Sequence, residues 1–266
     1  MRWWAQAAQR QVVSWQTGRD HVMETTESRW ANNHGVRLHY LVSASSDPSL
    51  TPVVLIPGAF GSAESYESEF AAFAPRRCVA ISLRGRGQSD APHSGYTIRH
   101  HATDIAAVVD HADLPRFTLM AYSVGVPYAI RYYTQGAPGL AGLILADYPA
   151  RLPQFTTDWV ERVQRLLSPD IARPHVVDAL KREASAVELW DELDGIRCPV
   201  LLLRGTQEGA LLSAEHVEQY RRHLPQAEVV EFWESGHELW RPNYERYIVV
   251  IKDFLGRING AHESAS

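Results

Sequence analysis

Short apolar runs alternate with longer amphipathic segments along most of this 266-residue chain. The runs are too short for helices and are typical of strands that are covered on both faces of a sheet. They lie at 53–56, 78–81, 117–121, 143–146, 200–203 and 229–232. Segments with helical periodicity separate or follow them, near 63–73, 97–112, from about 124, and near 244–255. This alternation predicts βαβ units, and therefore an α/β fold with a mostly parallel central sheet flanked by helices.

A different pattern precedes the first of these runs. Apolar and polar residues alternate over 36–41, after the turn-forming sequence Asn-Asn-His-Gly at 32–35 and the short segment 29–31. Strict alternation next to such a turn predicts a β-hairpin at the start of the fold.

The strand and helix rhythm breaks between 149 and 198. Helical periodicity continues there, through Trp159, Val163 and Leu166, without a convincing strand. A segment of this length is too long for an ordinary connection, so we interpret 150–195 as a small helical cap over the carboxyl edge of the sheet. The core then comprises 25–149 and 196–258, with an N-terminal extension at 1–24 and a flexible tail at 259–266.

Composition narrows the class of protein. Hydrophobic residues make up 45% of the chain, the formal net charge is -5, and no concentrated Lys/Arg run occurs, so nucleic acid is not expected as a partner. Two cysteines and the absence of a long apolar run predict no disulfide framework and no membrane span, with the cytoplasm as the default location. Residues 1–22 read as a short amphipathic helix or as a dispensable segment before Met23. No feature of the sequence indicates an oligomeric state.

The clearest chemical signal is a serine at a predicted turn from strand to helix. The sequence Ala121-Tyr122-Ser123-Val124-Gly125 follows an apolar strand and precedes a helix. It resembles the nucleophile elbow of the α/β-hydrolase superfamily, although Ala121 stands where glycine is usual. The simpler alternative is that Ser123 only caps the helix. The resemblance implies the α/β-hydrolase fold, with Ser123 as nucleophile assisted by a base, an acid and an oxyanion site.

The base that the resemblance implies is His237. Gly236-His237 follows the last predicted strand, with Pro242 further on, and resembles the catalytic-histidine loop of the same superfamily. The other histidines mostly fall in probable helices or loops without complementary ligands, and their spacing suggests no metal site. We therefore expect neither a metal nor another cofactor.

Two residues compete for the acid of the triad. Glu208 follows the strand at 200–203, where this superfamily usually carries an aspartate, and Asp147 ends the preceding strand at 143–146. Either carboxylate can orient an imidazole and stabilise the imidazolium. We favour Glu208 and keep Asp147 as the alternative.

The oxyanion donors are expected from two backbone segments. The resemblance assigns one N–H to Val124, after the nucleophile, and a second to the loop that follows the strand at 53–56. That loop resembles the oxyanion loop of the superfamily, with proline where histidine is common, which makes the N–H of Ala59 the second donor and that of Phe60 the alternative. The turn at 83–89 also matches the superfamily and is interpreted as structural.

Aromatic side chains near the catalytic loops and in the cap predict an apolar cleft. They are Phe60, Tyr122, Phe155, Trp159, Trp190 and Trp240. We expect a serine hydrolase that cleaves a carboxylic ester, lactone or thioester of a hydrophobic small molecule through an acyl-enzyme. A serine nucleophile argues against epoxide hydrolase and haloalkane dehalogenase chemistry, which needs a carboxylate. Two alternatives are a C–C bond hydrolase or cofactor-independent haloperoxidase, and a small-molecule receptor with a slow or silent triad.

Overall fold

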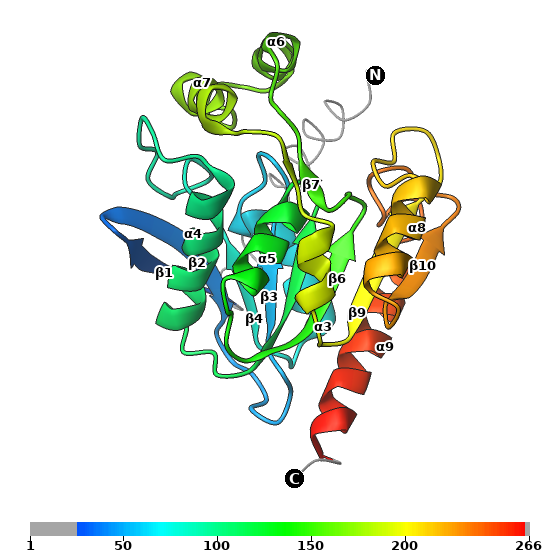
Figure 1. Cartoon of the computed structure of the whole chain (residues 1–266). Coiled ribbons are helices and arrows are strands. Elements are labelled where there is room, and N and C mark those ends of the chain that lie inside the picture. The colour runs from blue at the N-terminus through cyan, green and yellow to red at the C-terminus, as the bar shows by residue number, and fades with distance from the viewer. Residues whose placement is uncertain (1–25, 264–266) are drawn as a thin grey trace.

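An eight-stranded sheet forms the centre of the computed structural model, which describes residues 26–263 (Figure 1). The strand order is β1-β2-β4-β3-β5-β6-β9-β10. These strands are β1 (Thr26–Asn33), β2 (Val36–Ser43), β3 (Val53–Ile56), β4 (Cys78–Ile81), β5 (Phe117–Tyr122), β6 (Leu140–Ala146), β9 (Val200–Gly205) and β10 (Glu228–Phe232). The predicted extension at 1–24, with its possible helix, falls outside the described residues.

The sheet is mostly parallel, as predicted. β1 and β2 form the expected antiparallel hairpin, β2 runs antiparallel to β4, and the remaining neighbours pair in parallel. Every residue of β3 and β4 is buried, which explains why their sequences are uninterrupted apolar runs. The predicted fold class is therefore confirmed.

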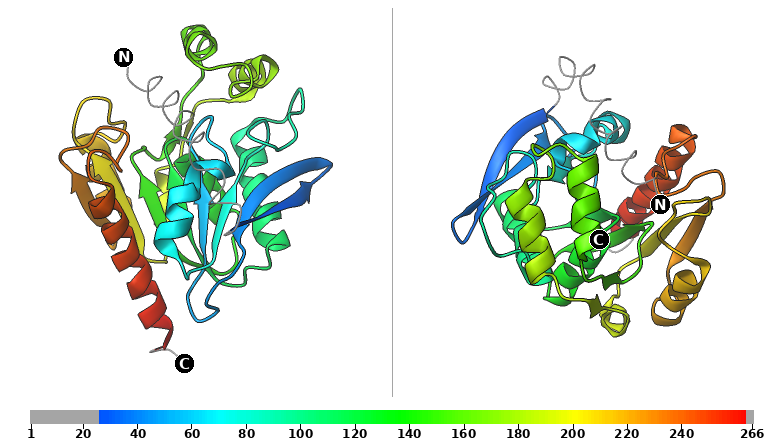
Figure 2. Two further views of the ribbon diagram at one scale, coloured as in Figure 1. Left: turned by 180° about the vertical axis from the view of Figure 1, so that it is seen from behind. Right: turned by 90° about the horizontal axis from the view of Figure 1, so that it is seen from above.

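Helices cover the two faces of this sheet (Figure 2). The helical segments of the core are η1 (Ala63–Tyr66), α3 (Glu67–Phe73), α4 (Ile98–His111), α5 (Gly125–Thr134), α8 (Ala214–His223) and α9 (Tyr244–Glu263). Alternate residues of each strand point to opposite faces, so α4, α5 and α8 share one apolar cluster with Val54 and Leu119. α3 and α9 share the other cluster, with Leu55 and Met120.

The cap consists of two helices on a narrow stem. α6 (Thr157–Leu166) and α7 (Pro174–Glu183) lie beyond the ends of the strands in Figure 1. β7 (Arg151–Leu152) and β8 (Val187–Glu188) pair antiparallel, and the N–H of Leu189 donates to the carbonyl of Ala150 at 2.9 Å. No strand was predicted here, because a two-residue strand is too short to show a period of two. After β8 comes the short 3₁₀ helix η2 (Asp191–Gly195), which contacts α5 and α8 of the core.

The end of the chain is helical where a flexible tail was predicted from 259. α9 continues to Glu263, five residues past the predicted end of the core. The carboxamide oxygen of Asn259 accepts hydrogen bonds from the N–H of Thr51 at 3.0 Å and from the guanidinium of Arg76 at 3.2 Å. These contacts attach the last turns of α9 to the core.

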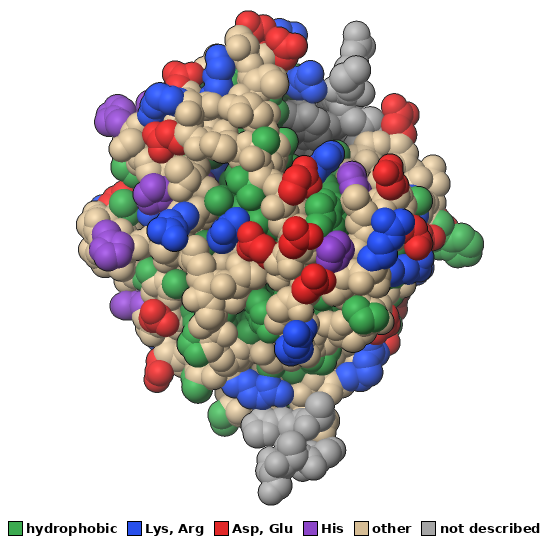
Figure 3. All heavy atoms as spheres, in the orientation of Figure 1, with side chains coloured by type: hydrophobic (Ala, Val, Ile, Leu, Met, Phe, Trp, Pro, Cys, Tyr) green, Lys and Arg blue, Asp and Glu red, His purple; other side chains and the backbone are tan. Residues whose placement is uncertain are grey.

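Two surface properties bear on possible partners. On the face shown in Figure 3, acidic and basic side chains are interspersed over the core and the cap. The expectation that nucleic acid is not a partner stays a prediction. None of the helices in the described range 26–263 is long and apolar enough to cross a membrane.

Candidate active site

The turn between β5 and α5 places Ser123 in a strained conformation. Its φ is +55°, in the left-handed region that residues with a Cβ seldom adopt. Gly125 permits the close approach of α5 to the preceding loop, since a Cβ there would lie 2.7 Å from the carbonyl oxygen of Pro57. Ala121, in place of the usual glycine, is fully buried in β5, so its methyl group is accommodated within the core. The local geometry is that of a nucleophile elbow.

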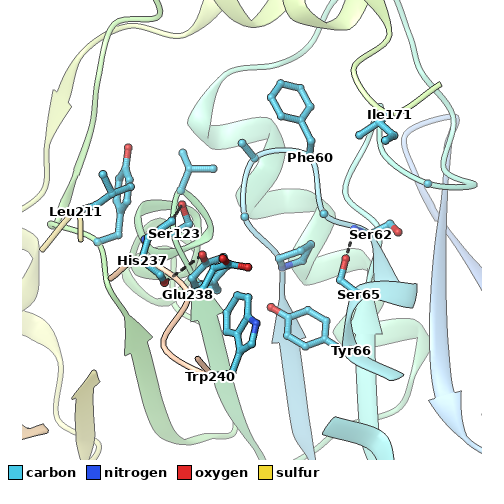
Figure 4. Close-up of a pocket in the computed structure, with 18 of the residues that line it drawn as sticks. Phe60, Ser62, Ser65, Tyr66, Ser123, Ile171, Leu211, His237, Glu238 and Trp240 are labelled. Atoms are coloured by element: carbon cyan, nitrogen blue, oxygen red, sulfur yellow. Dashed lines mark hydrogen bonds between the residues drawn. The ribbon is translucent and has the colours of Figure 1, made fainter. Parts of the chain in front are cut away.

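His237 lies on the loop after β10 and faces this serine (Figure 4). Its Nε2 is 2.9 Å from the Oγ of Ser123. The ring of Tyr122 stacks on the imidazole, with centroids 4.7 Å apart, and its hydroxyl donates to the carbonyl of His237 at 3.2 Å. The loop is held to β9 by the N–H groups of Thr206 and Gln207, which donate to the carbonyl of Ser235. The imidazole is therefore fixed by contacts on several sides.

Asp147, at the end of β6, is the carboxylate that contacts His237. Its Oδ2 is 2.7 Å from the Nδ1 of His237, and the side chain is fully buried. Three backbone N–H groups also donate to this carboxylate, those of Gly205 at 3.1 Å, Leu211 at 2.9 Å and Leu212 at 3.4 Å. A buried charge with this many donors is well stabilised. Ser123, His237 and Asp147 thus form one continuous chain of hydrogen bonds.

Glu208, the acid that we favoured from the sequence, is not part of this chain. It lies in the exposed turn after β9, and no hydrogen bond or ion pair joins its carboxylate to His237. The loop that contains it supplies backbone donors to Asp147 instead, through Leu211 and Leu212. β6 and β9 are hydrogen-bonded neighbours, so their ends lie close together and either could place an acid near the imidazole.

The loop after β3 lies against the elbow, as expected for an oxyanion loop. A Cβ at Gly58 would lie 3.1 Å from the Cβ of Ser123. No backbone acceptor within the described residues pairs with the N–H groups of Ala59, Phe60 or Val124, the three candidate donors. The buried guanidinium of Arg86 holds the loop by donating to the carbonyl of Ala59 at 2.9 Å.

The turn at 83–89 has the structural role that was predicted. The guanidinium of Arg84 makes a buried ion pair with Asp104 at 2.6 Å. Ser82, which stands where aspartate is frequent in the superfamily, accepts a hydrogen bond from the N–H of Ala63 at 2.9 Å. This turn therefore supports the loop that faces Ser123.

A cavity of about 730 Å³ opens above Ser123 and His237, between the core and the cap. This volume is in the range of small-molecule sites. Five of the six predicted aromatic residues line it: Phe60, Tyr122, Phe155, Trp159 and Trp240. Trp159 of α6 stacks on Phe60 at 5.9 Å and on Phe155 at 4.3 Å between ring centroids. These three rings, which we call the aromatic roof, link the cap to the loop after β3.

Trp190, the sixth predicted residue, does not line the cavity. Its ring packs against His216 and Tyr220 of α8, at centroid distances of 5.9 and 5.1 Å. Its Nε1 donates to the carboxylate of Glu188 at 2.8 Å. The chain has already passed through the stem and returned to the core at this point, which places the ring on the flank of the molecule.

Two buried carboxylates in the cavity wall were not predicted. Glu69 of α3 and Glu238, next to His237, are 7% and 8% exposed. Burial raises the pKa of Glu69 to about 7. The position of Glu238 directly after His237 was an available signal, whereas Glu69 is an ordinary acidic residue of a helix in the sequence.

The pKa values of two neighbouring tyrosines are raised in part by these carboxylates. Burial raises the pKa of Tyr66, and the charge of Glu69 raises it further. Burial likewise raises the pKa of Tyr122, to which Asp147 and then Glu238 add. Across 26–263, no group of three or more His, Cys, Asp or Glu side chains is arranged to hold a metal ion.

Known proteins share both the sequence pattern and the fold. The model of the alpha/beta hydrolase fold family matches residues 51–173. N-formylmaleamate deformylase of Pseudomonas putida is 25% identical over 262 residues, which cover 84% of this chain and 94% of that protein. Haloalkane dehalogenase 2 of Mycobacterium tuberculosis is 32% identical over 123 residues, 46% of this chain and 42% of that protein.

Solved structures extend this likeness over most of the chain. The crystal structure of the esterase RhEst1 from Rhodococcus sp. superimposes with a TM-score of 0.74 and 20% identity, over 88% of this chain and 99% of that one. The chain therefore has the α/β-hydrolase fold, and residues 51–173 resemble the family of that name in sequence. The proteins that it resembles include a deformylase and a haloalkane dehalogenase by sequence and an esterase by fold.

Proposed function

We propose that this protein is a serine hydrolase that cleaves an ester-like bond of a hydrophobic small molecule through an acyl-enzyme. The observation that carries the proposal is the buried chain of hydrogen bonds from Ser123 through His237 to Asp147, at the bottom of the cavity. A serine hydroxyl is a weak nucleophile, and this arrangement is the usual means of activating it. A serine that only caps a helix would need neither partner.

Each residue then has a defined part in acyl transfer. The Oγ of Ser123 attacks the carbonyl carbon while Nε2 of His237 takes its proton, and Asp147 holds Nδ1 and stabilises the imidazolium. The N–H groups of Val124 and Ala59, or alternatively Phe60, donate to the tetrahedral oxyanion. Collapse expels the leaving group, which takes the proton from His237. A water activated by His237 then attacks the acyl-enzyme, releases the acid and restores the hydroxyl of Ser123.

The aromatic roof supports an apolar acyl or alcohol group as the part of the substrate that is bound. Phe60, Phe155 and Trp159 offer ring faces and no charge above the nucleophile. Esters, lactones and thioesters share the carbonyl that Ser123 attacks. Dehalogenation is not proposed despite the dehalogenase relative, because an alkyl-ester intermediate needs a carboxylate nucleophile at the position of Ser123.

A second candidate is amide hydrolysis. The deformylase, whose name denotes removal of a formyl group, matches over 84% of this chain. Acyl transfer to Ser123 would proceed in the same way, but His237 must protonate a much more basic leaving nitrogen before the C–N bond breaks.

The first experiment measures the intact mass of the protein after incubation with a fluorophosphonate. We expect one adduct on the wild-type chain and none on Ser123→Ala, because only an activated serine reacts quickly. Turnover of matched esters, lactones, thioesters and N-acyl amides then assigns the bond. An unlabelled wild-type chain that still binds apolar ligands would overturn the proposal and favour a receptor with a silent triad.

A further inference from the structure

Glu238 presents a buried carboxylate, one oxygen of which lacks a hydrogen-bond donor. The side chain is 8% exposed and lines the cavity, and its Oε1 has no hydrogen-bond partner among the described residues. That oxygen forms an ion pair with the Nε of Arg241 at 3.7 Å, which is too long for a hydrogen bond, and the side chain of Arg241 is 48% exposed. Buried acceptors are nearly always paired in folded proteins, so an unpaired one in a cavity wall suggests that a ligand provides the donor.

The surroundings of Glu238 favour a positively charged donor. In Figure 4, Glu238, Trp240 and Tyr66 lie below Ser123, on the side of the cavity away from the cap. Glu69 of α3 is a second buried carboxyl group in the same wall.

Aromatic rings complete this part of the wall. Trp240 is held edge-on by Tyr122 at 5.2 Å and by Tyr247 at 6.1 Å between centroids. Ring faces attract ammonium groups, most strongly those of tryptophan. We call Glu69, Glu238, Tyr66, Trp240 and Tyr244 the carboxylate arm of the cavity, in contrast to the uncharged aromatic roof.

We propose that the carboxylate arm binds a protonated amine carried by the substrate, with Glu238 as its main acceptor. This inference rests on the proposed function, because the amine is taken to belong to a molecule that Ser123 attacks. The other charged side chains of the cavity are Arg162 and Asp170 from the cap segment and Arg241. Arg241 forms a long ion pair with the Oε1 of Glu238 but no hydrogen bond, and because its side chain is half-exposed, solvent screens this pair.

The test compares substrates of equal shape that differ in charge. For the alcohol side, 4-(aminomethyl)phenyl acetate is compared with 4-ethylphenyl acetate, and for the acyl side phenyl 6-aminohexanoate with phenyl heptanoate. The measured quantity is the ratio of kcat/KM within each pair at neutral pH. We expect the amine to be favoured about tenfold or more in one pair, which corresponds to one desolvated charge pair.

Variants assign that preference to a residue. Glu238→Gln should reduce the ratio about tenfold and Glu69→Gln should reduce it less, whereas Glu208→Gln, an exposed carboxylate outside the cavity, should leave the ratio unchanged. A ratio is used because a substitution beside His237 alters the absolute rate as well. Absence of an amine preference in both pairs, or a preference that survives Glu238→Gln, would overturn the inference.

A binding measurement separates this inference from the catalytic proposal. In Ser123→Ala, benzylammonium should bind at least about tenfold more tightly than ethylbenzene, and Glu238→Gln in that background should remove the difference. Tight ammonium binding by a wild-type chain that hydrolyses nothing would refute the proposed function and leave the site standing. Equal binding of the two ligands together with rapid ester hydrolysis would refute the site alone.

Discussion

The bottom of the cavity, where Ser123 and His237 lie, and the aromatic roof above it are held by different kinds of contact. At the bottom, Ser123, His237 and Asp147 are joined by directional hydrogen bonds and by backbone donors to the carboxylate. The roof is held by ring stacking and by a small apolar cluster of the cap, which includes Val163 and Val177. Directional bonds fix atoms for chemistry, whereas apolar packing accepts several shapes, so reaction and selectivity are separable in this molecule.

The largest expected effect on activity is that of Asp147→Asn, which changes the hydrogen-bonded chain at the bottom of the cavity. The amide keeps the shape but stabilises the wrong imidazole tautomer and no longer stabilises the imidazolium, so kcat should fall about 10⁴-fold for every substrate. Glu208→Gln is the matched control, and its activity should stay within about twofold because exposed substitutions rarely matter. Steady-state kinetics on a short and a long acyl ester check both. A comparable loss in Glu208→Gln would contradict the assignment of Asp147.

The second prediction concerns how the buried carboxyl group of Glu69, in the cavity wall, changes the free energy of unfolding with pH. Its pKa rises from 4.5 in the unfolded chain to about 7 in the folded protein, so the folded state binds this proton more tightly. Stability from this group is full below pH 4.5 and is lost as pH rises through about 7, which amounts to about 3 kcal/mol.

Urea unfolding of the wild type and of Glu69→Gln at about pH 5 and about pH 8 measures this contribution of Glu69 to the free energy of unfolding. We expect the wild type to lose stability relative to the variant at the higher pH. Parallel stability curves for the two chains would show that Glu69 does not titrate in this range.

Trp159→Ala addresses the roof and should have the smallest catalytic effect. Loss of the stacked indole removes apolar contact for long or aromatic acyl groups, which should lower kcat/KM for such esters about 10- to 100-fold and for acetate esters much less. Trp190→Ala is the control, since that ring packs on α8 outside the cavity. Equal losses on acetate and aromatic esters in Trp159→Ala would mean that the roof also serves the chemistry.

The sequence indicated the parts of the molecule that depend on local backbone rules. Buried parallel strands appear as apolar runs, and the elbow of Ser123 and the loop of His237 follow directly from strand ends. From the sequence we favoured Glu208 over Asp147, whereas the structure joins Asp147 to His237. The sequence could not decide between them because β6 and β9 are adjacent, and only the path of the loop after β9 shows which carboxylate reaches the imidazole.

Features that depend on packing between distant segments could not be predicted in the same way. Trp190 reads like a cap residue until the stem is known to end just before it. Asn259 looks like part of a tail, but its partners Thr51 and Arg76 lie some 200 residues away along the chain. Glu69 reaches the cavity only because η1 and α3 follow the oxyanion loop directly, and helical periodicity does not specify that direction.

The paired strands β7 and β8 make the cap a replaceable module. The chain leaves the core at Arg151–Leu152 and returns at Val187–Glu188, side by side, so the two ends of the inserted segment are already joined by backbone hydrogen bonds. An insertion with this geometry can change in length or sequence without moving the ends of the sheet strands. Grafting a different cap between these two positions would therefore offer a route to new substrate selectivity while Ser123, His237 and Asp147 stay unchanged.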